Sequence, residues 1–535
     1  MMNKIKKFLQ SPHHFALVFA ILYFLIGFIL VFTHEQIFDE VNPWQIAKSI
    51  TPENFFEVMR VEPHPPLWYF ILLPFAKLGL PLITTNFISL SIMALTVYLF
   101  LRFAPFRRGT KLACLLSVAF FYFFPVISRD YCLVPLALTL ITIAYPTRLE
   151  HPLRYGLTLV LLAQSHFLML SLAGILTLFF IYDYLKNRRQ KNRTTLHLAP
   201  FCVSIFLIIL SALSSIPSIL GTLDSHRLSR RSDDFSYALI NPDKIGTAPE
   251  HRYEKSLSYT EYSGEINSSL FFIFLPVFEI FAVAIIIYLI INYRRLAVCF
   301  TVFLATFFIS TFFVYLNFRN LTLKTATIIS VMIFIYWLTF LEKPRPLPRA
   351  QKFFHKIELI RYLSVKKYLA PALFVTPVLC TIPFTVASAV KDITAQCEDA
   401  VNPAVVNQLN STEDDAVIVV EGQPYVRSAF YVYTASLTGR RMLYDDYYKR
   451  PMDYVAYDNS EIEFAGYERL HDLFAELAEK YHTRNIYHVT IQGESSCGGP
   501  THVPYDDTWE YAFTIEPQNG NTRSLDVFKI NLDKY

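Results

Sequence analysis

The stretch FALVFAILYFLIGFILVFT, Phe15 to Thr33, holds nineteen residues and no charged side chain. A helix of that length is long enough to cross the hydrocarbon core of a bilayer. Basic residues precede it at Lys4, Lys6 and Lys7, and no small-residue cleavage site follows it. We therefore expect an uncleaved first membrane span with a cytoplasmic N-terminus; a cleaved signal peptide is the alternative.

Apolar runs of this kind continue as far as residue 390. The run 66–78 is short and contains Pro74, so we interpret it as an interfacial or re-entrant segment. The run 154–185 is too long for one span and is polar around His166, which predicts two helices that turn there. The Lys and Arg clusters between runs then fall on the cytoplasmic side, which gives eleven spans and an external C-terminus. The other runs lie near 82–102, 112–127, 132–147, 197–217, 269–291, 296–317, 322–341 and 369–390.

The charged residues divide the chain into two parts. The 535 residues are 53% hydrophobic and 17% charged, with a net charge of +4. From Lys391 to Tyr535 there are 12 basic and 24 acidic residues, whereas the preceding part holds 36 and 20. We expect a polytopic α-helical membrane domain over residues 1–390 and an extramembrane α/β domain over 391–535. Because the basic clusters are short and lie between apolar runs, they indicate membrane topology and make nucleic acid a poor partner.

The part after residue 391 has the pattern of a small α/β domain. Apolar residues at helical spacing predict a helix from Tyr467 to Tyr481. Its two cysteines, Cys397 and Cys497, form a disulfide bond in an oxidising compartment or remain free thiols; both possibilities stay open. Strand-like runs lie at Ala416 to Val420, Ile486 to Ile491, Tyr511 to Ile515 and Leu525 to Ile530.

The polar residues suited to chemistry gather in the segments that this topology places outside. Asp39 and Glu40 follow the first span closely. A segment Glu62-Pro63-His64-Pro65-Pro66-Leu67-Trp68-Tyr69 comes later in the same loop, and Ser128-Arg129-Asp130-Tyr131 forms the next one. Carboxylates beside a bilayer can also be plain solvated loop residues. The external segments are 34–81, 128–131, 218–268 and 318–324.

This order of features resembles the membrane glycosyltransferases of the GT-C superfamily, in particular the branch of protein O-mannosyltransferases and the lipid A aminoarabinose transferase. The resemblance covers roughly residues 10–185. It implies an inverting enzyme of the cell inner (plasma) membrane that works on the outer face. The donor would be a polyprenyl-phosphate sugar, and the acceptor a hydroxyl group of a cell-envelope glycan, a lipid or a protein.

The resemblance also implies roles for individual residues. Asp39 corresponds to the base, because inverting transfer needs a carboxylate to take the proton of the attacking hydroxyl. Glu40 and Asp130 would support it. The leaving lipid phosphate needs positively charged or hydrogen-bonding partners, for which the candidates are His64, Arg129, His166, Arg319 and Lys324.

Structural roles compete with these functional ones. Arg129 and Asp130 can simply pair with each other, and His166 can be a polar helix cap. Arg319 and Lys324 can anchor their helix at the membrane interface. The loop 218–268, with its Arg and Tyr residues, can close over a substrate or be a solvated excursion.

Glu62 and His64 are the candidate ligands of a divalent metal ion, and Asp130 is the alternative to Glu62 as the second ligand beside His64. The related enzymes usually carry an acidic residue directly before this position, where the chain has Pro63, so metal dependence stays open. The chain contains no GxGxxG, Walker, HExxH, CxxC or GxSxG segment and only 15 Gly, which argues against a nucleotide-sugar donor.

Two other classes of protein compete with a transferase. A transporter or flippase of lipid-linked sugars would place ionisable groups near the membrane midplane, often in two related halves. Here the candidate residues lie at one face, and no internal repeat is visible. An external sensory or assembly domain on a membrane anchor would need far fewer spans.

Overall fold

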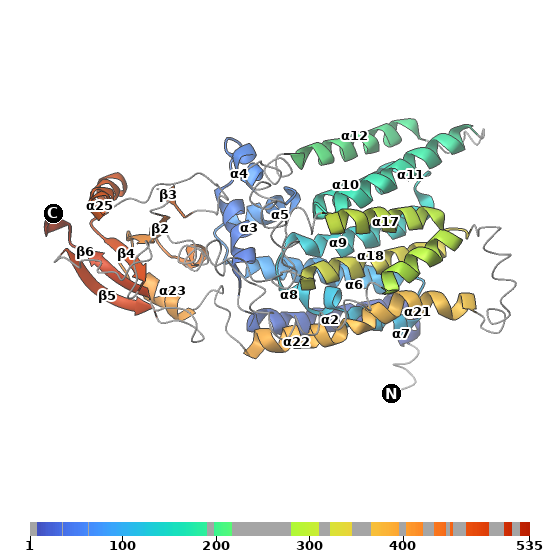
Figure 1. Cartoon of the computed structure of the whole chain (residues 1–535), viewed down its shortest axis with the longest axis horizontal. Helices are drawn as coiled ribbons and strands as arrows, with labels where there is room; N and C mark the ends of the chain where they lie inside the picture. Colours follow the sequence, from blue (N-terminus) through green and yellow to red (C-terminus); the bar gives the residue numbers. More distant parts are fainter. Residues whose placement is uncertain are drawn as a thin grey trace, which may run out of the picture.

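The computed structural model is mostly helical, with a small sheet domain at one end of its long axis (Figure 1). The N-terminus lies towards the other end, on the helical part. A helical part followed by a small α/β domain agrees with the prediction from sequence. The structure describes residues 8–34, 36–61, 64–189, 197–216, 280–309, 321–344, 365–394, 403–420, 433–445, 450–452, 467–491, 508–515 and 525–534.

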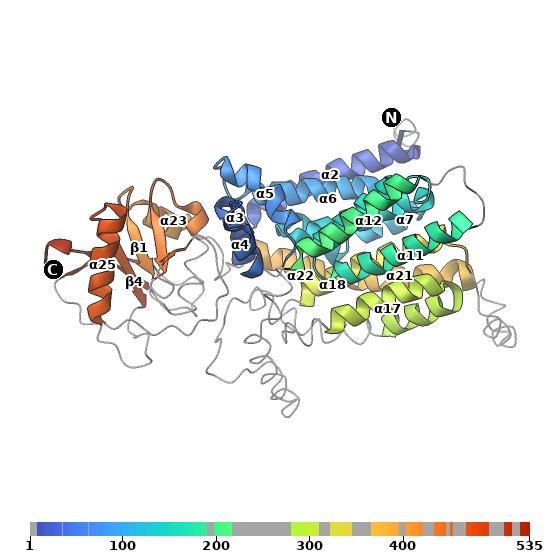
Figure 2. The same cartoon turned by 90° about the horizontal axis from the view of Figure 1, so that it is seen from above.

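The long helices run roughly along the same axis and form a bundle (Figures 1 and 2). α18 is buried almost all round from Ala326 to Leu338, as its uniformly apolar sequence requires. In chain order the helices are α2 (Pro12–Thr33), α6 (Thr84–Phe103), α9 (Leu133–Ala144), α10 (Pro152–Ser165), α11 (Met169–Arg189), α12 (Leu198–Ser214), a helix at Ile280–Asn292, α17 (Arg294–Ile309), α18 (Leu321–Leu341), α21 (Val365–Cys380) and α22 (Ile382–Thr394).

Five helical segments in the described part are long and apolar enough to cross a membrane, and a bent pair would make a sixth. Several shorter apolar helices lie beside them, α5 (Leu67–Lys77), α12, α18 and Ile280–Asn292 among them. On α2 and α12 large apolar side chains such as Ile29 and Phe206 point outward and are more than 60% exposed. Such surfaces suit contact with lipid. The five segments are Pro12–Thr33, Thr84–Phe103, Asp130–Thr147, Met169–Arg189 and Leu369–Ala387.

Two of the predicted irregularities are present. The run 154–185 forms α10 and α11, and His166 lies in the short turn between them. The run 66–78 forms only the eleven-residue helix α5. The run 112–127, which we predicted as one span, consists instead of α7 (Arg108–Leu115) and the segment Ala119–Val126, bent by 63°. A π-helical turn at Ala119–Phe123 begins the second segment, and such turns disturb regular helix geometry.

Basic side chains mark the end of the bundle that lies away from the sheet domain. Arg102 at the end of α6 contacts His13 at the start of α2, with 2.9 Å between Nη1 and Nδ1. Deeper in, Asp183 of α11 pairs with Arg148 at 2.8 Å and with Arg295 of α17 at 2.7 Å. These ion pairs tie helices that are far apart in the sequence.

The C-terminal domain contains a six-stranded sheet in the order β3-β2-β1-β4-β6-β5. The central strand β1 pairs in parallel with β2 and β4, while β3, β6 and β5 run antiparallel to their neighbours. The short helix α23 (Pro403–Asn410) precedes the sheet, and α25 is the predicted helix Tyr467–Tyr481. The strands are β1 (Val417–Val420), β2 (Met442–Asp445), β3 (Arg450–Pro451), β4 (Ile486–Ile491), β5 (Trp509–Ile515) and β6 (Leu525–Ile530).

Both faces of this sheet are covered. Val417 and Val419 belong to the same buried cluster as Phe474 of α25. On the other face Ile418 and Val420 join the continuous core of the helical part, and the 3-10 turn η7 (Thr434–Ser436) contacts α3 (Phe38–Ser49). The domain is therefore packed against the end of the bundle that carries α3.

Candidate functional site

The candidate residues meet at the end of the bundle that faces the C-terminal domain. The short helices α3 and α4 (Phe55–Val61) lie at this end, between the long helices and the sheet (Figures 1 and 2). The loop before α5 supplies His64, the segment before α9 supplies Arg129 and Asp130, and the turn after α10 supplies His166. Together with α3, which carries Asp39 and Glu40, these are four separate stretches of sequence that form one site.

Glu40 is fully buried and accepts four hydrogen bonds. Its Oε2 lies 2.6 Å from His34 Nε2 and 3.0 Å from the backbone nitrogen of Ile37. Its Oε1 lies 2.6 Å from Asn86 Nδ2 and 2.7 Å from the backbone nitrogen of Ser128. A carboxylate with both oxygens occupied in this way holds its surroundings together and has little capacity left for a substrate.

Asn86 of α6 strengthens this network with two more hydrogen bonds. Its Nδ2 also donates to Val126 O at 2.8 Å, and its Oδ1 accepts from Gln36 Nε2 at 2.7 Å. The start of α3, the start of α6 and the segment before α9 are thus fixed to one another through buried polar groups. This arrangement determines where Asp39 and Arg129 lie.

Asp39 precedes Glu40 on α3 but points to a different environment. Its side chain is 30% exposed and pairs with Arg129, at 2.9 Å between Oδ1 and Nη1. The same Nη1 donates to the backbone oxygen of Asp39 at 2.8 Å. Among the described residues Oδ2 of Asp39 has no hydrogen-bond partner. The site therefore contains one oriented carboxylate oxygen that a substrate can reach.

Arg129 connects Asp39 to His64. Its Nη2 lies 2.8 Å from His64 Nε2. Since an arginine can only donate, Nε2 is the acceptor and the proton of a neutral His64 ring sits on Nδ1. That Nδ1 lies 3.0 Å from Asp130 Oδ2, and the two groups form an ion pair when His64 is protonated. The result is a chain of contacts from Asp39 through Arg129 and His64 to Asp130.

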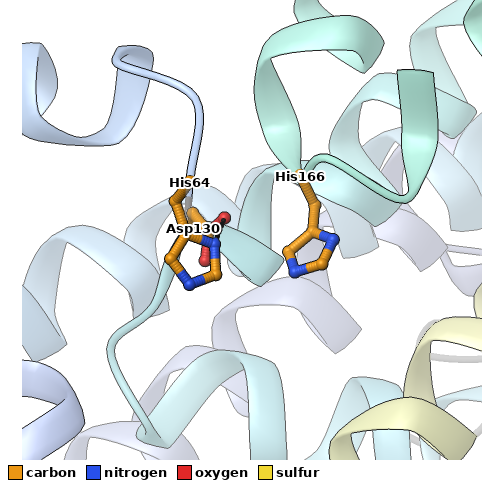
Figure 3. Close-up of side chains that lie close together, drawn as sticks. All are labelled: His64, Asp130 and His166. Carbon is orange, nitrogen blue, oxygen red and sulfur yellow. Dashed lines mark ion pairs between the residues drawn. The ribbon is translucent and has the colours of Figure 1, made fainter. Parts of the chain in front are cut away.

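His166 completes the group from the opposite side (Figure 3). It is 1% exposed, and its ring stacks at a tilt on Tyr131 with 4.4 Å between centroids. Its Nδ1 accepts from the backbone nitrogen of Leu168 at 3.2 Å, while its buried Nε2 has no hydrogen-bond partner in the described part of the chain. His64, Asp130 and His166 each offer one ligand atom, and these three atoms lie within 4.8 Å of one another.

Burial and charge shift the titration of two groups at this site. Burial acts to lower the pKa of Arg129, but the carboxylates of Asp39 and Asp130 outweigh it and raise that pKa above its ordinary value. Burial lowers the pKa of His166 to about 3, although the Asp130 carboxylate acts in the opposite direction. Arg129 is therefore a permanent cation, and His166 is neutral at physiological pH.

The structure brings together six of the residues singled out in the sequence: Asp39, Glu40, His64, Arg129, Asp130 and His166. Lys324 lies in the first turn of α18, and its side chain is not described. The predicted residues Glu62, Arg319, Cys397 and Cys497, together with the loop 218–268, lie outside the described residues.

Sequence reasoning missed the residues that hold Glu40. His34, Gln36 and Asn86 were not considered, although Asn86 is a polar residue near the start of an apolar run. That position is a signal, because a buried amide needs partners in a bilayer. Its partners are distant in sequence, however, so no local pattern identifies them.

Comparison with protein-family models gives no match to this chain. Comparisons with curated protein sequences and with solved structures likewise give no significant match.

Proposed function

We propose that the chain is an inverting glycosyltransferase of the GT-C kind, which transfers a sugar from a polyprenyl-phosphate donor to a hydroxyl acceptor. The observation that supports this best is the pairing of Asp39 with Arg129 beside His64 and His166. A reachable carboxylate oxygen and groups suited to a phosphate lie together there. Inverting transfer from a lipid phosphate requires both.

In this proposal Asp39 is the base. The acceptor oxygen attacks the anomeric carbon of the donor, and the bond from that carbon to the phosphate oxygen breaks. The phosphate leaves with the bonding electron pair, and the acceptor proton passes to Oδ2 of Asp39. Arg129 holds the other carboxylate oxygen at 2.9 Å, so the orientation of Asp39 is fixed before the substrate arrives.

The leaving phosphate would bind on the side of Asp39 where Arg129, His64 and His166 lie. Arg129 presents two guanidinium nitrogens there, and a guanidinium can hold phosphate oxygens in a fork. Glu40 keeps the loop of Arg129 in place through the backbone of Ser128. Asp130 orients His64 from its other nitrogen. We also propose Arg319 and Lys324 as partners of the phosphate, as the resemblance implies.

The membrane arrangement we propose has eleven spans, with the site and the C-terminal domain on the outer face of the cell inner (plasma) membrane. The basic residues at the opposite end of the bundle support this orientation. The lipid chain of the donor would lie against the apolar sides of the helices. The C-terminal domain contacts α3 through η7, which is where an acceptor approaching Asp39 would pass.

Sugar transfer by the purified chain tests the proposal. Wild type, Asp39→Asn and the control Asp533→Asn are incubated with a panel of polyprenyl-phosphate sugars and membrane extract, and donor consumption is followed by mass spectrometry. Asp533 is an exposed residue of the C-terminal domain, 73% accessible in its side chain. We expect turnover in wild type and in the control, and none in Asp39→Asn.

Two results would contradict the proposal. Full activity of Asp39→Asn would remove Asp39 as the base. A wild-type protein that binds donor and moves it between the leaflets of a vesicle without consuming it would be a transporter of lipid-linked sugars instead.

A further inference from the structure

We propose that His64, Asp130 and His166 bind a divalent transition-metal ion of the zinc type. The inference concerns the site of the proposed transfer and rests on that function for its role, although metal binding can be measured without any sugar donor. The three side chains come from three different loops and converge on one point (Figure 3). Two imidazole nitrogens and one carboxylate oxygen are a donor set that zinc and its neighbours accept. Magnesium and calcium prefer oxygen alone.

A buried polar atom without a partner at the centre of the group supports a missing ligand. Among the described residues, Nε2 of His166 is buried and has no hydrogen-bond partner. Buried polar atoms in folded proteins nearly always have partners. Oδ2 of Asp130 and Nδ1 of His64 lie 3.0 Å apart, and all three side chains offer ligand atoms within 4.8 Å of one another. Such a convergence of nitrogen and oxygen donors from separate loops is what ligands around one ion show.

The net charge of the site also favours a bound cation. Among the described residues of the site, Asp39, Glu40 and Asp130 supply three negative charges, and Arg129 supplies one positive charge. These four groups together carry a charge of −2, and an arriving lipid phosphate would make the site more negative. An ion of charge +2 neutralises the site and allows a phosphate to bind beside it.

Metal binding has a consequence for Arg129. Ligation through Nδ1 of His64 leaves the ring proton on Nε2, which then faces the Nη2 of Arg129 at 2.8 Å. The N–H groups of His64 and Arg129 would then face each other as two donors and would move apart, so Nη2 of Arg129 becomes available for the phosphate. The same proton shift at His166 gives up the 3.2 Å contact from Leu168. Neutral hydrogen bonds of this kind are weak beside a metal–ligand bond.

Zinc titration of the full chain tests the inference. The protein in detergent micelles is stripped with EDTA, dialysed, and titrated with zinc chloride by calorimetry, with magnesium as the comparison ion. We expect one zinc ion per chain and no comparable magnesium binding. Asp130→Asn and His166→Gln should each weaken zinc binding by more than about tenfold. The control His197→Gln, at an exposed position before α12, should bind as wild type does.

Arg129→Gln should change the zinc affinity in the opposite direction. It removes the donor that faces His64 and one positive charge, so zinc binding should become tighter. Equal zinc affinity in wild type and in folded His166→Gln, or no zinc binding at all, would overturn the inference. Each variant is also melted with and without zinc, so that a folding defect is recognised as a low Tm without metal. Zinc binding by a chain that transfers no sugar would leave the metal site standing and refute the transfer. Sugar transfer at the full rate by metal-free protein would leave the transfer standing and refute a role for the metal ion in it.

Discussion

Replacing Glu40 by Gln tests whether the buried carboxylate acts as a structural tie. The change preserves size and shape but exchanges one oxygen for an NH2 group. Placed on the side of Oε1, that group faces the backbone nitrogen of Ser128; placed on the side of Oε2, it faces that of Ile37. A backbone N–H cannot reverse its role, so either orientation leaves a buried donor facing another donor.

The size of the effect follows from the bonds that are lost. His34 can adapt by moving its ring proton, so the lowest-cost orientation sacrifices the contact from Ile37. A hydrogen bond to a charged group contributes about 1.5–3 kcal/mol, and the stranded N–H adds to the loss. We expect the free energy of unfolding to fall by about 3 kcal/mol, which corresponds to a Tm lower by roughly 3 °C.

Thermal unfolding in one detergent, followed by intrinsic fluorescence, measures this. The matched control is Glu53→Gln, an exposed residue in the same loop, which should leave the Tm within about 1 °C of wild type. Sugar transfer by Glu40→Gln should also decrease, because the start of α3, which carries Asp39, is no longer fixed through the backbone nitrogen of Ile37. A Glu40→Gln protein with the Tm of wild type would refute the view that the four hydrogen bonds fix this site.

Three further predictions concern stability elsewhere in the chain. In Gly156→Ala the new Cβ would lie 2.4 Å from the Cβ of Ser204, so α10 and α12 must separate at a cost of about 1–3 kcal/mol. Gly174→Ala is the control, because no other described atom lies within 4 Å of the Cβ added there. Equal Tm values for the two variants would contradict the close packing of α10 on α12. Burial lowers the pKa of His488 to about 4, below the value of about 6.5 in an unfolded chain, so the unfolded state binds more protons between these values. The stability of the C-terminal domain should fall by about 3 kcal/mol as the pH falls from 6.5 to 4. In melting curves of His488→Gln, this decrease of stability with falling pH should be absent. Asp183→Asn leaves Arg148 and Arg295 without their shared carboxylate and should lower the free energy of unfolding, measured with denaturant, by about 2–3 kcal/mol. High salt should not lower the stability of wild type by this amount, because salt screens partly buried ion pairs only weakly.

Elements with a regular pattern could be read from the sequence. The helix predicted from Tyr467 to Tyr481 has those same bounds, because its apolar residues recur at helical spacing over a charged background. The strands β2 and β3 were missed. β2 is the four residues Met442–Asp445, in which Leu443 and Tyr444 are both buried, so it shows no alternation. Its position in the sheet is determined by pairing with β1, which no local pattern reveals.

The site was predictable to a similar extent. The residue types pointed to Asp39, Arg129 and His64, but the sequence could not separate the roles of Asp39 and Glu40. Successive residues on a helix point about 100° apart, so one carboxylate faces the core and the other faces the opening. Which of them is buried depends on His34 and Asn86, and only the folded structure shows those contacts.

The separation of charge along the chain makes the molecule an electric dipole in the membrane. Basic side chains such as Arg102 and Arg295 mark one end of the bundle, while the acidic C-terminal part, with 24 acidic against 12 basic residues, lies at the other. A membrane that is negative inside stabilises a positive charge on its inner side by about 2.3 kcal/mol per 100 mV. In the proposed orientation, with the basic end of the bundle inside, an energised membrane would therefore oppose reversal of this protein.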